Sequence, residues 1–191
     1  MRTPEYAQLL TAAALTLGLI EGQMHRMGCT HCLNLLATYP EGCRAYCAYC
    51  GLARREETRD CADRNFIRVD WPAVHYEEII ARVKNGDDRN QFKRMCISMI
   101  SHPDSNDDTF VLLERWVREV PQIPVSILFN PTTLDYDDLV RMRDLGADIF
   151  TVALDAVTPE IFDRARGGVD SPRQWDKCWC TTESVAEVYE P

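Results

Sequence analysis

Four short apolar segments, each followed by a stretch with helical periodicity, constrain the fold of this chain more than any other feature. The segments cover residues 33–39, 95–100, 125–130 and 148–156. Nearly all are apolar on both faces, which is typical of parallel strands buried between two layers. Strands that alternate with helices form a parallel sheet that those helices cover. We therefore predict an α/β fold, either a partial (βα) barrel of the TIM type with about four βα units or a doubly wound sheet.

The helices between these segments are predicted from apolar residues spaced three or four positions apart. One helix is expected from about Pro72, a second over residues 107–120, and a third that ends at Gly146. Glycine at that place is suited to a helix C-terminus. A last helix is expected to have Ser171 as its N-cap and Pro172 at its first position.

The N-terminal residues 4–20 are rich in Ala and Leu and predict one more helix. We accordingly divide the chain into an N-terminal helical extension, residues 1–32, and a core, residues 33–191. The apolar run in the extension lacks the basic flank and the cleavage site of a signal peptide. No run of about 18 apolar residues, the length of a membrane span, is present. We expect a cytoplasmic protein without a membrane segment.

The exposed edges of the predicted sheet suggest that the sequence is part of a longer protein. Four parallel strands leave two exposed edges, which is an unstable arrangement for a buried parallel sheet. After the last predicted strand, the 191 residues end in a helix. We therefore expect the sequence to be truncated at its C-terminus relative to a longer protein.

Nine cysteines are a high number for a chain of this size, and six of them lie between residues 29 and 61. Secreted disulfide scaffolds are short and poor in core residues, whereas 46% of these residues are hydrophobic. An odd number of crowded cysteines fits metal binding in a reducing compartment better. Cys43, Cys47 and Cys50 form the pattern C-x3-C-x2-C within residues 41–55, which we call the cysteine loop.

The cysteine loop follows the first predicted strand, and barrels of this type carry their chemistry on loops at the carboxyl ends of the strands. Three thiolates bind three irons of a [4Fe–4S] cluster and leave the fourth iron open to a substrate or cofactor. Two alternatives remain: a zinc-binding module that borrows Cys29 and Cys32, and three buried thiols without a metal. A small zinc site would not need the α/β body that follows it.

The segment CRAYCAYC resembles the signature of the radical S-adenosylmethionine (radical SAM) enzymes. Tyr49, which precedes the last cysteine, is aromatic as in that family. The resemblance implies that Cys43, Cys47 and Cys50 hold a [4Fe–4S] cluster whose unique iron binds the amino and carboxylate groups of S-adenosylmethionine, with Tyr49 near the adenine. One electron then cleaves the cofactor, and the 5′-deoxyadenosyl radical abstracts hydrogen from an unactivated C–H bond.

The segment GADIFTVALDAVTPEIFDRARGG resembles the fourth strand and the following loop of the biotin synthase and lipoyl synthase-like branch. In that branch an Asp in LD-x-x-x-P-E-x-F lies beside the cofactor ribose, and Asp155 matches it. The alternative is that Asp155 is the N-cap of a helix that begins near Pro159. By strand position, Ser98 and Met99 are expected near the methionine end of the cofactor, where this chain has SMISH and many relatives have a GGE-like stretch.

The other cysteines allow a second metal site. Cys96 lies where biotin synthase has one ligand of a second, sulfur-donating cluster, but the third strand lacks the other cysteine of that enzyme. Cys96 can equally be a small buried residue. Sulfur insertion as in biotin and lipoyl synthases would require such a second cluster. Its candidate ligands are Cys29, Cys32, Cys61, Cys96, Cys178 and Cys180.

The charge pattern bears on partners. A formal net charge of −9 argues against a nucleic-acid partner. The arginines on and after the cysteine loop form either an ordinary solvated surface or a docking face for an electron donor such as flavodoxin or ferredoxin, or for an anionic substrate. These arginines are Arg44, Arg54, Arg55, Arg59, Arg64 and Arg68. We expect a small-molecule or carrier-bound substrate, with a truncated cluster-binding protein without catalysis as the alternative.

Overall fold

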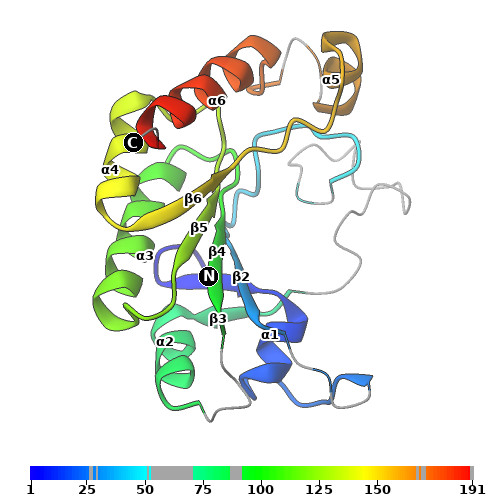
Figure 1. The fold of residues 1–191 in the computed structure, drawn as a ribbon. Helices are drawn as coiled ribbons and strands as arrows, with labels where there is room; N and C mark the ends of the chain where they lie inside the picture. The colour runs from blue at the N-terminus through cyan, green and yellow to red at the C-terminus, as the bar shows by residue number, and fades with distance from the viewer. Residues whose placement is uncertain are drawn as a thin grey trace.

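The computed structural model describes residues 1–25, 28, 30–50, 52, 71–86, 92–166, 168 and 171–189. Its centre is a six-stranded sheet with the order β3-β1-β2-β4-β5-β6 (Figure 1). The strands are β1 (Tyr6–Leu9), β2 (Cys32–Leu36), β3 (Ala73–His75), β4 (Arg94–Ser98), β5 (Val125–Leu128) and β6 (Ala147–Thr151). The helices are α1 (Thr11–Thr16), α2 (Tyr76–Lys84), α3 (Ser105–Glu119), α4 (Tyr136–Asp144), α5 (Pro159–Arg166) and α6 (Trp175–Tyr189).

The four predicted strands are present and are parallel to one another. β2 pairs with β4, β4 with β5, and β5 with β6, all in parallel register. The carboxyl ends of all four therefore meet at one edge of the sheet, as the pattern of strand and helix required. The prediction of an α/β fold with about four βα units is confirmed at the level of secondary structure and topology.

The N-terminal prediction is wrong in part. Residues 6–9 form β1, which pairs antiparallel with β2 on one side and with β3 on the other, and the helix α1 covers only Thr11–Thr16. Ala and Leu favour a helix locally, but pairing with an otherwise open strand edge and burial of Ala7 and Leu9 outweigh that preference. The extension is thus not purely helical, and β2 does not have the exposed edge that we expected. The division of the chain at residue 32 stays a prediction.

Two helix starts differ from the predictions. The helix expected from Pro72 begins at Tyr76, because residues 73–75 form the short strand β3. The last helix begins at Trp175, so Ser171 is not its N-cap. The Ser171 hydroxyl instead donates to the Arg166 carbonyl (2.6 Å) and accepts from the Arg173 amide (3.2 Å).

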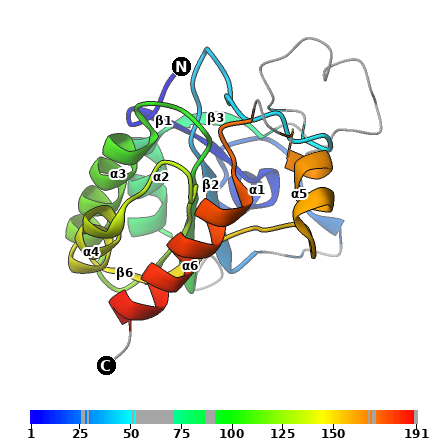
Figure 2. The same ribbon diagram turned by 90° about the horizontal axis from the view of Figure 1, so that it is seen from above.

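The helices are distributed unequally over the two faces of the sheet. α2, α3 and α4 cover one face, and α1 and α5 lie on the opposite side, as Figure 1 and Figure 2 show together. α6 packs against α4. No helix in the part of the chain that the structure describes is long and apolar enough to cross a membrane.

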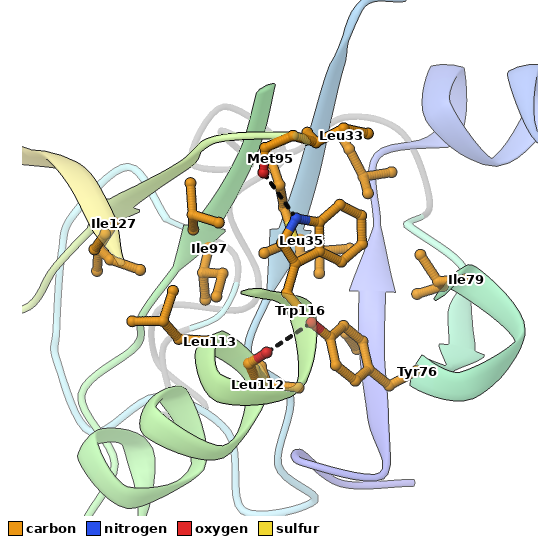
Figure 3. Close-up of a cluster of buried hydrophobic side chains, with 14 of the residues drawn as sticks. Leu33, Leu35, Tyr76, Ile79, Met95, Ile97, Leu112, Leu113, Trp116 and Ile127 are labelled. Carbon is orange, nitrogen blue, oxygen red and sulfur yellow. Dashed lines mark hydrogen bonds between the residues drawn. The ribbon is translucent and has the colours of Figure 1, made fainter. Parts of the chain in front are cut away.

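Most of the main core lies between the sheet and α2, α3 and α4, part of which Figure 3 shows, and Ala13 and Ala14 of α1 also belong to it. Trp116 and Tyr76 are its largest fully buried side chains. Each polar atom has a partner: the Trp116 indole N–H donates to the Ile123 carbonyl (3.1 Å), and the Tyr76 hydroxyl donates to the Leu112 carbonyl (2.8 Å). Buried aromatic residues stabilise a core best when their polar ends are satisfied in this way.

A second, smaller hydrophobic group lies beneath the cysteine loop, and we call it the loop core. Its buried members are Leu36, Ala37, Tyr39, Cys43, Ala45, Cys47 and Ile100. Tyr49, Cys50, Leu52 and Trp71 pack against it while remaining partly exposed. The loop core therefore fixes the cysteine loop on the carboxyl ends of β2 and β4.

Candidate functional site

The cysteine loop begins with a tight turn. The Gly42 amide donates to the Tyr39 carbonyl (3.0 Å), and Gly42 has φ of 71°, a left-handed conformation that favours glycine. The chain then folds back on itself, because the Cys43 amide donates to the Leu52 carbonyl (3.1 Å). This turn directs the three cysteines toward the carboxyl ends of the strands.

A cavity of about 270 Å³ opens between the cysteine loop, the ends of β2, β4 and β5, and the segment after β6. Six lining residues are those that we predicted to bind the cluster or the cofactor: Cys43, Cys47, Tyr49, Cys50, Ser98 and Asp155. Met99 also lines it. The fold thus gathers at one place residues that lie more than a hundred positions apart in the sequence.

Cys43 is held from the β4 side of the cavity. The Ser101 amide donates to the Cys43 sulfur (3.4 Å), and the Ser101 carbonyl accepts from the Arg44 amide (2.8 Å). The buried Asn130, just after β5, donates from its side chain to the Ser101 hydroxyl (3.0 Å). We did not select Ser101 or Asn130 from the sequence, although a polar Asn at the end of an apolar strand is a usable signal for a site residue.

Arg166, at the end of α5, is the main residue that sequence reasoning missed. Its side chain is 5% exposed and donates to the Cys47 sulfur (3.5 Å), to the Ala153 carbonyl (2.5 Å) and to the Asp155 carboxylate. The only available signal was periodicity: Arg166 is four residues after the buried Phe162, so both lie on one face of α5.

Asp155 has a left-handed backbone with φ of 54°, which is uncommon for a residue other than glycine. Its Oδ2 atom accepts hydrogen bonds from the Tyr49 hydroxyl and from Arg166. The alternative role as N-cap is not observed: α5 begins at Pro159, and the Thr158 hydroxyl accepts from the Ile161 amide (3.4 Å). Strained conformations of this kind cluster at functional sites.

The protonation of the site follows from burial and from close partners. Burial, and then the hydrogen bond to Asp155, raise the pKa of the Tyr49 hydroxyl well above its usual range. Burial and the neighbouring Cys47 also raise the pKa of the Cys50 thiol. Burial lowers the pKa of the Arg166 guanidinium, but its interactions with Cys47, Tyr49 and Asp155 outweigh this and raise it overall. Tyr49 is thus neutral and Arg166 charged at neutral pH.

The residues around the cavity fit an iron–sulfur cluster. Cys43, Cys47 and Cys50 are free thiols. Two of them accept N–H···S hydrogen bonds, and a buried cation lies beside one, as the negative charge of bound thiolates requires. Within the described residues, no three Cys, His, Asp or Glu side chains are close enough to hold a single metal ion. A cubane cluster does not need such convergence, because each thiolate binds a different iron.

The described cysteines proposed for a second cluster form two separate pairs. Cys32 on β2 and Cys96 on β4 are diagonal neighbours on adjacent strands, because Cys96 is paired with Asn34. Burial, and then the nearby Cys32, raise the pKa of the Cys96 thiol. Cys178 is buried and Cys180 is exposed, both on α6. Cys29 and Cys61 lie outside the described residues, as do all of the predicted arginine patch except Arg44.

Parallel strands whose carboxyl ends carry a metal-binding loop are the architecture of barrel enzymes that hold their cofactors at that end. The family model of the radical SAM superfamily matches residues 38–178, and the chain belongs to this superfamily. Its members are enzymes that act on their substrates with a reductant, and the family implies a [4Fe–4S] cluster and S-adenosylmethionine as cofactors.

Among solved structures, the chain is similar to the crystal structure of methylornithine synthase (PylB), with 17% sequence identity and a TM-score of 0.55. The match covers 81% of this chain and 41% of that chain, so the present sequence spans less than half of the length of the similar protein. This likeness shows the fold, an incomplete radical SAM-type barrel. A search of curated proteins returns no significant match.

Proposed function

We propose that this chain binds a [4Fe–4S] cluster through Cys43, Cys47 and Cys50 and uses it with S-adenosylmethionine to abstract hydrogen from an unactivated C–H bond. The observation that carries the proposal is the shared cavity, which the three free thiols line together with Tyr49, Ser98 and Asp155. When bound, the cluster and S-adenosylmethionine supply one-electron chemistry that no amino acid side chain provides.

The chain's own residues have separate tasks in this proposal. Asp155 accepts hydrogen bonds from the cofactor ribose through Oδ1, which makes no side-chain hydrogen bond within the described residues, while Oδ2 is held by Tyr49 and Arg166. The Tyr49 ring forms one wall of the cavity beside the adenine. Ser98 and Met99 lie at the end of β4, on the side proposed for the methionine moiety.

The choice of relatives and reaction is also a proposal. The LD-x-x-x-P-E-x-F segment supports the biotin synthase and lipoyl synthase-like branch. We do not extend it to sulfur insertion, because that reaction needs a second cluster and the third predicted strand, residues 125–130, lacks the cysteine that biotin synthase has there. An acidic electron donor such as flavodoxin or ferredoxin, and a small-molecule or carrier-bound substrate, complete the proposal.

The test is made under anaerobic conditions with the 191-residue chain. The protein is reconstituted with iron and sulfide and reduced, and electron paramagnetic resonance spectra are recorded with and without S-adenosylmethionine, while 5′-deoxyadenosine is measured. A cluster signal that changes with the cofactor, together with 5′-deoxyadenosine, is the expected result. A cluster that ignores the cofactor would overturn the catalytic proposal, and zinc in place of iron would overturn the cluster.

The matched controls change cysteines inside and outside the cavity. Replacing Cys43, Cys47 and Cys50 together by Ala removes all three proposed ligands, so we expect no bound cluster. Cys180→Ala changes an exposed thiol on α6 and should leave iron and acid-labile sulfide at the wild-type level. Equal losses in both variants would contradict the assignment of the ligands.

A further inference from the structure

The buried arginine beside the cavity needs an explanation that goes beyond packing. A charged group inside a protein is costly unless it is paired and hydrogen-bonded. Arg166 is 5% exposed, and its guanidinium also lies over the Tyr49 ring, 5.6 Å from the ring centre. Its Nε atom is buried and has no hydrogen-bond partner within the described residues. A residue kept only for stability would more often be apolar at such a position.

Two hydrogen bonds hold the backbone of α5 in place at Arg166. The Ala48 amide, in the cysteine loop, donates to the carbonyl of the preceding Ala165 (2.9 Å), and the Ser171 hydroxyl donates to the Arg166 carbonyl (2.6 Å). The end of α5 is therefore attached to the cysteine loop, and both views of the fold show α5 beside that loop (Figures 1 and 2). These two hydrogen bonds hold the backbone at Arg166 next to the cysteine loop.

The guanidinium joins two parts of the site that are otherwise separate. One nitrogen, Nη1, donates to the Cys47 sulfur in the cysteine loop, and the other, Nη2, donates to the Ala153 carbonyl and the Asp155 carboxylate after β6. The planar fork of arginine can make both contacts at once, whereas the single ammonium of a lysine cannot. Arg166 is thus the shared partner of a proposed cluster ligand and of the proposed ribose ligand.

This double contact has a definite electrochemical consequence. Hydrogen bonds to the sulfur ligands and nearby positive charge favour the reduced form of an iron–sulfur cluster, because reduction adds negative charge. The same cation fixes one oxygen of the Asp155 carboxylate and leaves the other directed to a ligand. Loss of the cation should therefore change the cluster and the cofactor site together.

We infer that Arg166 is a positioning residue that raises the reduction potential of the cluster through Cys47 and holds the Asp155 carboxylate in place for the cofactor ribose. The inference rests on the proposed function, since it presupposes the cluster on Cys47. According to this inference, the Arg166 side chain couples reduction of the cluster to binding of the cofactor.

The test is a redox titration of the reconstituted cluster, followed by electron paramagnetic resonance, with no substrate present. Arg166→Met removes the charge and both contacts, and we expect the reduced form to be disfavoured about tenfold, a fall of about 59 mV in the midpoint potential of this one-electron couple. Arg166→Lys keeps the charge but makes only one contact, so its potential should lie between those of Arg166→Met and the wild type. Equilibrium binding of S-adenosylmethionine should weaken in both variants.

The matched control is Arg164→Met, which removes the same charge from an exposed position on the same helix. Its potential and its cofactor affinity should equal those of the wild type. Equal potentials in all four proteins would overturn the inference while leaving the proposed function intact. If Arg166→Met assembles no cluster, the Arg166→Lys variant decides: a wild-type potential overturns the inference, and a lowered one supports it. A wild-type chain without a cluster would instead refute the proposed function itself.

Discussion

The main core and the loop core are built from similar apolar side chains but serve different ends. Most of the main core lies between the sheet and α2, α3 and α4, and its described members include no cysteine. The loop core lies at the carboxyl ends of the strands, and it includes Cys43 and Cys47 among its buried members. The difference indicates that one core supplies most of the stability, whereas the other presents reactive groups on a stable base.

This division is tested most strongly in the main core. Trp116→Ala should lower the free energy of unfolding by about 3–5 kcal/mol, because it removes a fully buried aromatic side chain and leaves a cavity. Urea denaturation of the apoprotein measures this loss. Val111→Ala, on the same helix but 42% exposed, should cost less than about 0.5 kcal/mol. A loss of similar size in both variants would mean that α3 does not form the main core.

The complementary change on the cavity side is Asp155→Asn. Asparagine tolerates the left-handed backbone as well as aspartate does, but it leaves the buried Arg166 guanidinium without its carboxylate partner, so the free energy of unfolding should fall. The loss of a charged hydrogen-bond acceptor, about 1.5–3 kcal/mol, predicts roughly 10- to 100-fold weaker binding of S-adenosylmethionine. Asp163→Asn, an exposed change on α5, is the control, and equilibrium binding is the measurement. Unchanged affinity in Asp155→Asn would remove Asp155 from the cofactor site.

The smallest expected effect lies where the N-terminus, α3 and the loop core meet. The buried His102 ring stacks on Tyr39, with ring centres 3.8 Å apart, and its Nδ1 atom accepts from the Asp104 amide (3.2 Å). That acceptor role requires the neutral ring. Burial, against the opposing effects of Asp104 and Glu41, lowers the pKa of His102 below its ordinary 6.5.

The pH dependence follows from this direction. Just below pH 6.5 the unfolded chain binds more protons at His102 than the native protein does. The contribution of His102 to the free energy of unfolding should therefore be fully present above pH 6.5 and decrease as the pH falls below it. Urea denaturation above and below that pH should give a smaller pH dependence for His102→Asn than for the wild type. The same slope in His102→Asn and in the wild type would contradict the burial argument.

The parallel part of the sheet could be predicted because its strands are short apolar runs in the sequence, although their burial ranges from β5, which is buried along most of its length, to β6, which is mostly exposed. β1 and β3 could not be predicted in that way. Their residues form strands through pairing with β2 and with each other, and Leu10 to Ala14 resemble a helix regardless of what precedes them. Pairing of this kind is a tertiary effect that no local window contains.

The candidate site shows the same limit. The cysteine loop and Asp155 were found because their spacing and sequence context carry the signal of a family. Arg166 was missed because an arginine in a short amphipathic helix is usually solvated, and the sequence does not show that α5 is attached to the cysteine loop. What distinguishes Arg166 from the exposed Arg164 is its helical position relative to Phe162, a difference that acquires meaning once the face of α5 that is buried is known.

The antiparallel strands β1 and β3 make the two ends of the sheet different from each other. Among the described strands, β1 blocks the edge of β2, and the outermost strand on that side is β3 with three residues. Of the strands that the structure describes, a further parallel strand, whether from the same polypeptide or from another, could therefore pair only with β6. Within the described part of the chain, the antiparallel N-terminal pairing thus ends the parallel array on one side, and β6 is its edge on the other.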